Sequence, residues 1–309
     1  MNNNTAHTNY TSKQARLTVP EKNRWIWIPI FIVLVFLGDR IGGYILMQLE
    51  STSNFRFTRL YHQKAACDIL IAGNSRGLSF YQPFVEKKSN KKVFSLAYNG
   101  MSSSLGHVFI EDYFENYPAP EKLILEVTCA DRYNKELVPA FACYTPYSNH
   151  LKEYIKEKEP KTYYATKVSH LLRYNSEVFQ RSLRYLKNDD RLWLTDRTIS
   201  EAMQHKSTQL KNISIDLIPE LQSPLAATVK LAQSKGTEVI LIVAPFLPNY
   251  YDALYNLDDY IDEVEKNTGL KVYNYGGAIQ DPKLFGDYFH LNVFGSEQFV
   301  SRLHQDQLF

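Results

Sequence analysis

Residues 68–77 of the chain read Asp68-Ile69-Leu70-Ile71-Ala72-Gly73-Asn74-Ser75-Arg76-Gly77. The apolar run Asp68–Gly73 is typical of a strand that is buried on both faces of a parallel sheet. Gly73 and Asn74 tolerate the dihedrals of a sharp turn, and Ser75 follows directly, before a predicted helix. A serine in this place lies where open α/β sheets bind ligands, beside backbone N–H groups that can stabilise an oxyanion.

A second polar block, Asp287-Tyr288-Phe289-His290-Leu291-Asn292, lies near the C-terminal end and precedes Gly295 and a predicted terminal helix. Histidine is the commonest general base, and a nearby carboxylate can orient its ring. Taken separately, Ser75 could cap a helix, and Asp287 and His290 could form a capping pair. Taken together, the three residues supply the nucleophile, base and orienting carboxylate of a catalytic triad.

The two blocks resemble those of the SGNH (GDSL-like) hydrolases, which carry a serine block after the first strand and an Asp-x-x-His block near the C-terminus. The resemblance extends over roughly residues 67–309, with a gap in the middle. It implies that Ser75 attacks an acyl ester, that His290 acts as the base and that Asp287 orients His290. It also implies that the Gly100 N–H, after the second strand, helps to stabilise the oxyanion.

The third block departs from the family pattern. After the third strand the family carries Gly-x-Asn-Asp, whereas this chain has Thr128-Cys129-Ala130-Asp131-Arg132. No asparagine stands there, so Asn99 or Asn74 is expected to replace it, although Asn74 itself stands where the family has aspartate. The predicted oxyanion and substrate-binding residues are Gly100, Asn99, Asn74 and Arg76, and no metal and no cofactor is expected.

Strands and helices are predicted to alternate, which indicates a flavodoxin-like three-layer α/β/α fold with a five-stranded parallel sheet in the order 2-1-3-4-5. The predicted strands are Asp68–Gly73, Val93–Tyr98, Lys122–Thr128, Glu238–Pro245 and Lys271–Tyr275. The predicted helices are Arg76–Lys88, Ser103–Tyr117, Pro219–Lys235, Tyr250–Thr268 and Val293–His304. Residues 130–220 interrupt the pattern and are expected to form a mainly helical insertion over the active-site end of the sheet, with Arg132 and Tyr133 nearest to the site.

The N-terminal part predicts a membrane anchor. Residues 1–24 are polar and form a predicted cytoplasmic tail, residues 25–47 a predicted transmembrane helix, and residues 48–66 a connector to a domain over residues 67–309. Trp25–Met47, as one helix, would be about 34 Å long, enough to cross a bilayer. A buried helix of a soluble protein is the alternative. No small-residue cleavage site follows a short apolar core, so an anchor is favoured over a signal peptide.

Asp39 and Arg40 interrupt this predicted span just past its middle, a costly place for charge. They are expected to pair with each other, to place the arginine toward the far interface, or to mark contact with a membrane partner. Slightly more cations precede the span than follow it, which favours a cytoplasmic N-terminus and a periplasmic or extracellular domain.

The composition excludes some functions. The chain has 309 residues, a net charge of +2 and dispersed cations, which gives no indication of nucleic-acid binding. Cys67, Cys129 and Cys143 match no zinc pattern; Cys129 and Cys143 could pair, or all three could be free core residues.

The leading interpretation is a membrane-anchored serine acyltransferase or esterase that acts on O-acyl groups of cell-envelope glycans or lipids. A span followed by a divergent SGNH domain looks most like the teichoic-acid D-alanylation and polysaccharide O-acetylation proteins. That resemblance implies a membrane-bound O-acyltransferase as a partner. The alternatives are a non-catalytic accessory or glycan-binding protein with the same fold, and a soluble cytosolic esterase.

Overall fold

A computed structural model describes residues 25–128, 133–216 and 219–309. Five parallel strands form one sheet in the order β2-β1-β3-β4-β5, which confirms the predicted fold class. The strands are β1 (Ile69–Ala72), β2 (Val93–Ser95), β3 (Lys122–Glu126), β4 (Glu238–Val243) and β5 (Val272–Asn274). Every residue of β1 is buried, as the continuous apolar run predicts for the middle of a sheet covered on both faces.

Alternate residues of the central strands face two separate cores. Leu70, Leu123 and Leu241 pack in a core with residues of α4 (Ser103–Asn116), α10 (Pro219–Ser234) and α12 (Leu257–Thr268). The isoleucines that alternate with them pack with residues of α3 (Gln82–Ser89) and α13 (Val293–Gln305) on the opposite face. Because all five strands are parallel, their carboxyl ends share one edge of the sheet. Ser75 follows β1, Asn99 follows β2, and His290 lies in the longer loop between β5 and α13.

Two predicted helices are each divided in the structure. Residues 75–79 form a 3₁₀ turn, η2 (Ser75–Ser79), and α3 begins only at Gln82. Pro83 explains the second start, because proline is favoured in the first turn of a helix and its fixed φ suits that position. Tyr250–Thr268 is likewise not one helix: α11 (Pro248–Ala253) ends before α12 begins at Leu257.

The segment between β3 and α10 contains short helices joined by loops. They are α5 (Leu137–Ala140), η3 (Phe141–Tyr144), α6 (Asn149–Lys158), α7 (Pro160–Val168), η4 (Leu171–Tyr174), α8 (Glu177–Arg184) and α9 (Glu201–Ser207). Cys143 is buried in this segment, and Cys129 lies outside the described residues, so their pairing stays a prediction.

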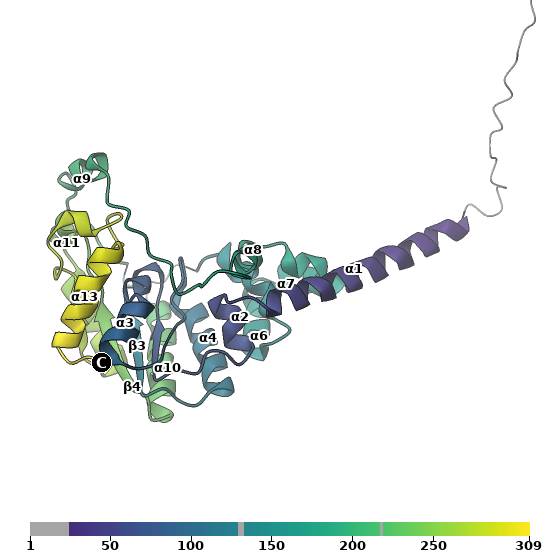
Figure 1. The fold of residues 1–309 in the computed structure, drawn as a ribbon, viewed down its shortest axis with the longest axis horizontal. Coiled ribbons are helices and arrows are strands. Elements are labelled where there is room, and N and C mark those ends of the chain that lie inside the picture. Colours follow the sequence, from purple (N-terminus) through teal and green to yellow (C-terminus); the bar gives the residue numbers. More distant parts are fainter. Residues whose placement is uncertain (1–24, 129–132, 217–218) are drawn as a thin grey trace, which may run out of the picture.

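The N-terminal helix α1 (Trp27–Ser51) projects from the domain, at the end opposite α11 and α13 (Figure 1). It is long and apolar enough to cross a membrane, judged by its length and composition alone. It continues beyond Met47, and the predicted connector contains a further helix, α2 (Arg56–Tyr61). Phe57 and Leu60 of α2 are fully buried in the domain core, so the connector is part of the folded domain.

Candidate active site

A cavity of about 500 Å³ lies where the predicted catalytic residues meet. Ser75, Asp287 and His290 line it together with Asn99 and Gly100. These residues come from three separate loops, which follow β1, β2 and the last strand of the sheet. Five of the seven predicted site residues therefore border one cavity, whereas Asn74 and Arg76 do not line it.

Ser75 is presented by a tight turn after β1. Gly73 has a φ of +145°, and a Cβ added to it would lie 2.8 Å from Cβ of Glu126 on the neighbouring strand β3. Any side chain at Gly73 would therefore meet both backbone strain and a steric clash. The Asn74 side chain accepts a hydrogen bond from the Arg76 N–H at 2.8 Å, which closes the turn and starts η2 at Ser75.

The Asp287–His290 loop holds its own two side chains together. One oxygen of Asp287 accepts hydrogen bonds from the backbone N–H groups of Phe289 and His290, at 2.8 and 3.0 Å. Nδ1 of His290 lies 2.8 Å from both carboxylate oxygens. Partial burial would raise the pKa of Asp287, but the hydrogen bonds from the His290 ring and the backbone outweigh it and lower that pKa below its usual value.

The ionised carboxylate favours a proton on Nδ1, which leaves the lone pair of Nε2 available to accept a proton. Nε2 is buried and has no hydrogen-bond partner among the described residues. No hydrogen bond joins it to Ser75 Oγ in the described part of the chain. Hydrogen bonds between catalytic groups are often long before a substrate binds, so the shared cavity is the relevant geometry.

Arg76 is buried next to Ser75, where its hydrogen bonds connect the serine turn to the histidine loop. It is 4% exposed, and Nε donates to Thr128 Oγ1 at 2.7 Å and to Glu126 Oε1 at 3.3 Å. Nη1 donates to the Phe289 carbonyl at 3.1 Å, and Nη2 donates to the Ala244 carbonyl. These contacts make Arg76 a positioning residue rather than a residue of the cavity wall.

We expect Arg76→Leu to lower the free energy of unfolding by about 3–5 kcal/mol, because it removes one partner of the buried Arg76–Glu126 ion pair. Urea unfolding of the full chain in detergent measures this effect. Arg191→Ala is the matched control: Arg191 pairs with Asp189 at the surface, and such a pair contributes about 1 kcal/mol or less. Equal losses in the two variants would contradict the role of Arg76.

Another part of the cavity wall was not predicted from the sequence. Arg56 of α2 forms a buried ion pair with Asp190 at 2.7 Å, and its guanidinium lies 4.3 Å from the centre of the Trp193 ring. Trp193 Nε1 donates to the Leu78 carbonyl at 2.9 Å, close to the serine turn. Arg181 completes the wall and lies over the Tyr98 ring at 5.1 Å. These contacts join residues far apart in the sequence, and no motif signals them.

A second cavity of about 500 Å³ adjoins the first and shares Tyr98, Asn99 and Arg181 with it. Asn134 lines the second cavity, and its Nδ2 donates to the Gly100 carbonyl at 3.3 Å. This asparagine lies just beyond the stretch where the family pattern places one, and the sequence interpretation missed it. Residues 129–132, including Arg132, lie outside the described residues, and Tyr133 hydrogen-bonds Glu159 instead of lining the first cavity.

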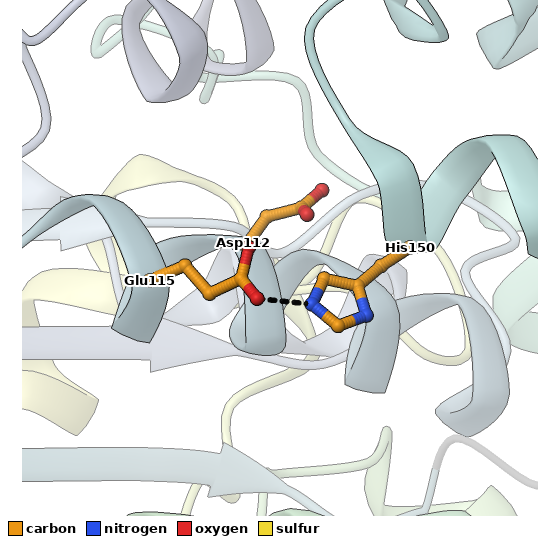
Figure 2. A group of neighbouring side chains, drawn as sticks. All are labelled: Asp112, Glu115 and His150. Atoms are coloured by element: carbon orange, nitrogen blue, oxygen red, sulfur yellow. Dashed lines mark hydrogen bonds and ion pairs between the residues drawn. The ribbon is translucent and has the colours of Figure 1, made fainter.

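Figure 2 shows the side chains of Asp112, Glu115 and His150, whose oxygen and nitrogen atoms lie close enough together to hold a metal ion. None of the three residues lines the first cavity. His150 Nε2 lies 2.7 Å from Glu115 Oε1. Asp112 accepts hydrogen bonds from Tyr61 Oη at 2.5 Å and Ser148 Oγ at 2.8 Å. Its carboxylate is therefore already engaged, and the group is explained as the polar contact between α4 and α6.

No family model matches the chain, and no curated protein sequence does. Several solved structures resemble its fold, two of which are described next. One is described as a "putative acylhydrolase" from Bacteroides fragilis, with 10% sequence identity, a TM-score of 0.37 and coverage of 80% of this chain and 89% of that chain. The other is a GDSL-like lipase from Bacteroides thetaiotaomicron, with 11% identity, a TM-score of 0.35 and coverage of 77% and 88%. Both likenesses are weak, so the function proposed below rests on the geometry of the cavity.

Proposed function

We propose that the protein is a membrane-anchored serine esterase or acyltransferase of the SGNH type that acts on O-acyl groups of cell-envelope glycans or lipids. The observation that carries the proposal is the Asp287–His290 pair, with an available Nε2, on the same cavity as Ser75. The apolar helix α1 supports the anchor, and the charge distribution supports a cytoplasmic N-terminus with the domain on the other side.

In the proposed reaction, Ser75 Oγ attacks the acyl carbonyl carbon while His290 Nε2 takes the hydroxyl proton. Asp287 stabilises the resulting imidazolium. The carbonyl π electrons move to the oxygen, and backbone N–H groups beside Ser75 and Gly100, with the Asn99 side chain, are the proposed donors to this oxyanion. When the carbon–oxygen bond to the leaving alcohol breaks, His290 returns the proton to that alcohol.

The acyl group then remains as an ester on Ser75. An incoming hydroxyl group attacks it, gives its proton to His290 and releases Ser75 by the reverse sequence. Water as the incoming group makes the protein an esterase, and a glycan or lipid hydroxyl makes it an acyltransferase. A membrane-bound O-acyltransferase is the proposed protein partner in the second case.

A non-catalytic role is the second candidate. The absence of a hydrogen bond between Ser75 and His290 in the described structure favours it. In that role the same polar cavity would bind an acylated glycan for a membrane-bound O-acyltransferase.

A fluorophosphonate probe distinguishes the two roles, because it reacts only with an activated serine. We expect the detergent-solubilised full chain to be labelled at Ser75, as identified by peptide mass spectrometry, and we expect labelling to disappear in Ser75→Ala and His290→Ala. Ser301→Ala, on α13, should be labelled like the wild type. A folded wild-type chain that resists labelling would support the binding role.

A further inference from the structure

The second half of α1 lies against the domain instead of standing free. The Asp39 carboxylate accepts hydrogen bonds from Ser169 Oγ and from the backbone N–H groups of His170, at 2.8 Å, and Leu171, at 3.2 Å. Arg40 Nη2 donates to the Val168 carbonyl at 3.1 Å, and Nη1 lies 3.4 Å from Asp39. Both charges in the predicted span thus contact the chain's own α7–η4 segment, residues 160–174.

Small residues let the two segments approach closely. A Cβ added to Gly43 would lie 2.5 Å from Cβ of His170, and one added to Gly42 would lie 3.0 Å from a methyl carbon of Leu171. Glycine at both positions therefore permits a contact that any larger residue would disturb. Figure 1 shows α7 beside the domain end of α1.

The position of this contact along α1 determines how deep in the bilayer the contact lies. Asp39 lies twelve residues after Trp27, which is about 18 Å along a helix. A bilayer core is about 30 Å thick, so a helix that enters at Trp27 has about 12 Å still to cross at Asp39. Beyond Asp39, one face of α1 stays exposed and apolar, at Ile41, Tyr44 and Ile45. The part of the α7–η4 segment that contacts Asp39, on the other face, therefore lies in the acyl region of the nearer leaflet, below its headgroups.

The composition of the α7–η4 segment suits that place. Its exposed apolar side chains are Tyr164, Val168, Leu171 and Leu172, and Val168 is 76% exposed. The segment also carries Lys161, Lys167 and Arg173 and contains no Asp or Glu. Aromatic, aliphatic and cationic side chains without acidic ones are the composition of a segment that inserts its apolar side chains below the headgroups of an anionic membrane while its cations reach up to them.

We infer that the α7–η4 segment inserts into the nearer leaflet of an anionic bilayer beside α1, with its cations reaching the headgroups, and so forms a second membrane attachment of the domain. The inference rests on the proposed anchor. The two attachments together fix the tilt of the domain, which a single helix and a flexible connector would leave free. Leu172 also lines the second cavity, so this attachment brings that cavity next to the lipid surface.

Depth-dependent fluorescence quenching tests the inference on the full chain. Single-cysteine variants Val168→Cys and Leu172→Cys, made after Cys67, Cys129 and Cys143 are replaced by alanine, carry an environment-sensitive dye. The protein is reconstituted in vesicles of phosphatidylethanolamine and phosphatidylglycerol whose lipids bear nitroxide groups either in the upper part of the acyl chains or deep in them. Ile32→Cys reports on the anchor. Tyr255→Cys is the matched control, an exposed aromatic position next to α11, at the end of the molecule opposite α1.

We expect the dyes at 168 and 172 to lose most of their fluorescence to the nitroxides in the upper acyl chains, while the dye at 255 keeps its fluorescence. Quenching at 32 by nitroxides placed deep in the acyl chains, with none at 168 and 172, would overturn the second attachment and leave the anchor intact. Absence of quenching at 32 as well would overturn the anchor, and the inference with it.

If replacement of the cysteines prevents folding, a photoreactive benzoylphenylalanine at position 168 of the otherwise native chain gives the same decision. Cross-links to lipid support the second attachment. Cross-links to protein alone, which would identify a protein partner on this surface, overturn it.

Discussion

Ser75→Ala and His290→Ala are each expected to lower the turnover of a model acetyl ester by about a million-fold, the size of effect seen when the nucleophile or the base of a serine triad is removed. Without Oγ no acyl-enzyme can form, and without Nε2 the proposed acceptor of the hydroxyl proton is lost. The residual rate would come from binding and from the oxyanion donors alone.

The double variant provides the sharper test. Because the two residues act as one unit, Ser75→Ala/His290→Ala should be no slower than either single variant. Steady-state assays of the full chain in detergent measure this, with the melting temperature as the control for folding. Losses that multiply in the double variant would show that the residues act separately, and turnover that survives either change would contradict the triad.

The sheet could be predicted from the sequence because its strands are continuous apolar runs. The strand Glu238–Val243, for example, is buried along most of its length. In a chain that alternates strands with helices, a central place in a parallel sheet is the usual way to bury such a run of apolar side chains. The breaks in the helices could not be predicted in the same way. Whether residues 75–79 form a 3₁₀ turn depends on Arg76, whose partners lie 50 or more positions away at Glu126, Ala244 and Phe289.

The same distinction applies to the site. That Ser75, Asp287 and His290 would meet at one cavity could be predicted because each lies in a short local block, and the Asp287–His290 contact is itself local. Arg76 was predicted to bind substrate, yet its side chain turns inward, since the buried Glu126 offers a partner that no sequence pattern reveals.

The features that were not predicted also depend on contacts between residues that are far apart in the sequence. The cavity wall depends on Arg56 and Asp190, which are 134 positions apart. Asp39 was predicted to be a costly charge in an apolar helix, and its actual partners lie about as far away, at Ser169 and His170. Periodicity and local motifs carry no information about such contacts.

Asp287→Asn is expected to lower turnover by about ten-thousand-fold while the loop keeps its shape, the effect of the corresponding change in a serine protease. The amide oxygen of asparagine can still accept the backbone N–H groups of Phe289 and His290, which hold the loop. The amide nitrogen, however, is a donor, so His290 would have to accept at Nδ1 and carry its proton on Nε2. That tautomer cannot take a proton from Ser75, and the imidazolium would lose its neighbouring charge.

Asp281→Asn is the matched control, because Asp281 likewise accepts a backbone hydrogen bond, from Lys283 at 2.9 Å, but does not line the cavity. It should keep turnover close to that of the wild type. The rate of fluorophosphonate labelling at Ser75 should fall in parallel with turnover in Asp287→Asn, since both reactions need the same activated hydroxyl. An Asp287→Asn variant that keeps wild-type labelling and turnover would show that His290 is not the base, and the carboxylate would then be only the structural centre of its loop.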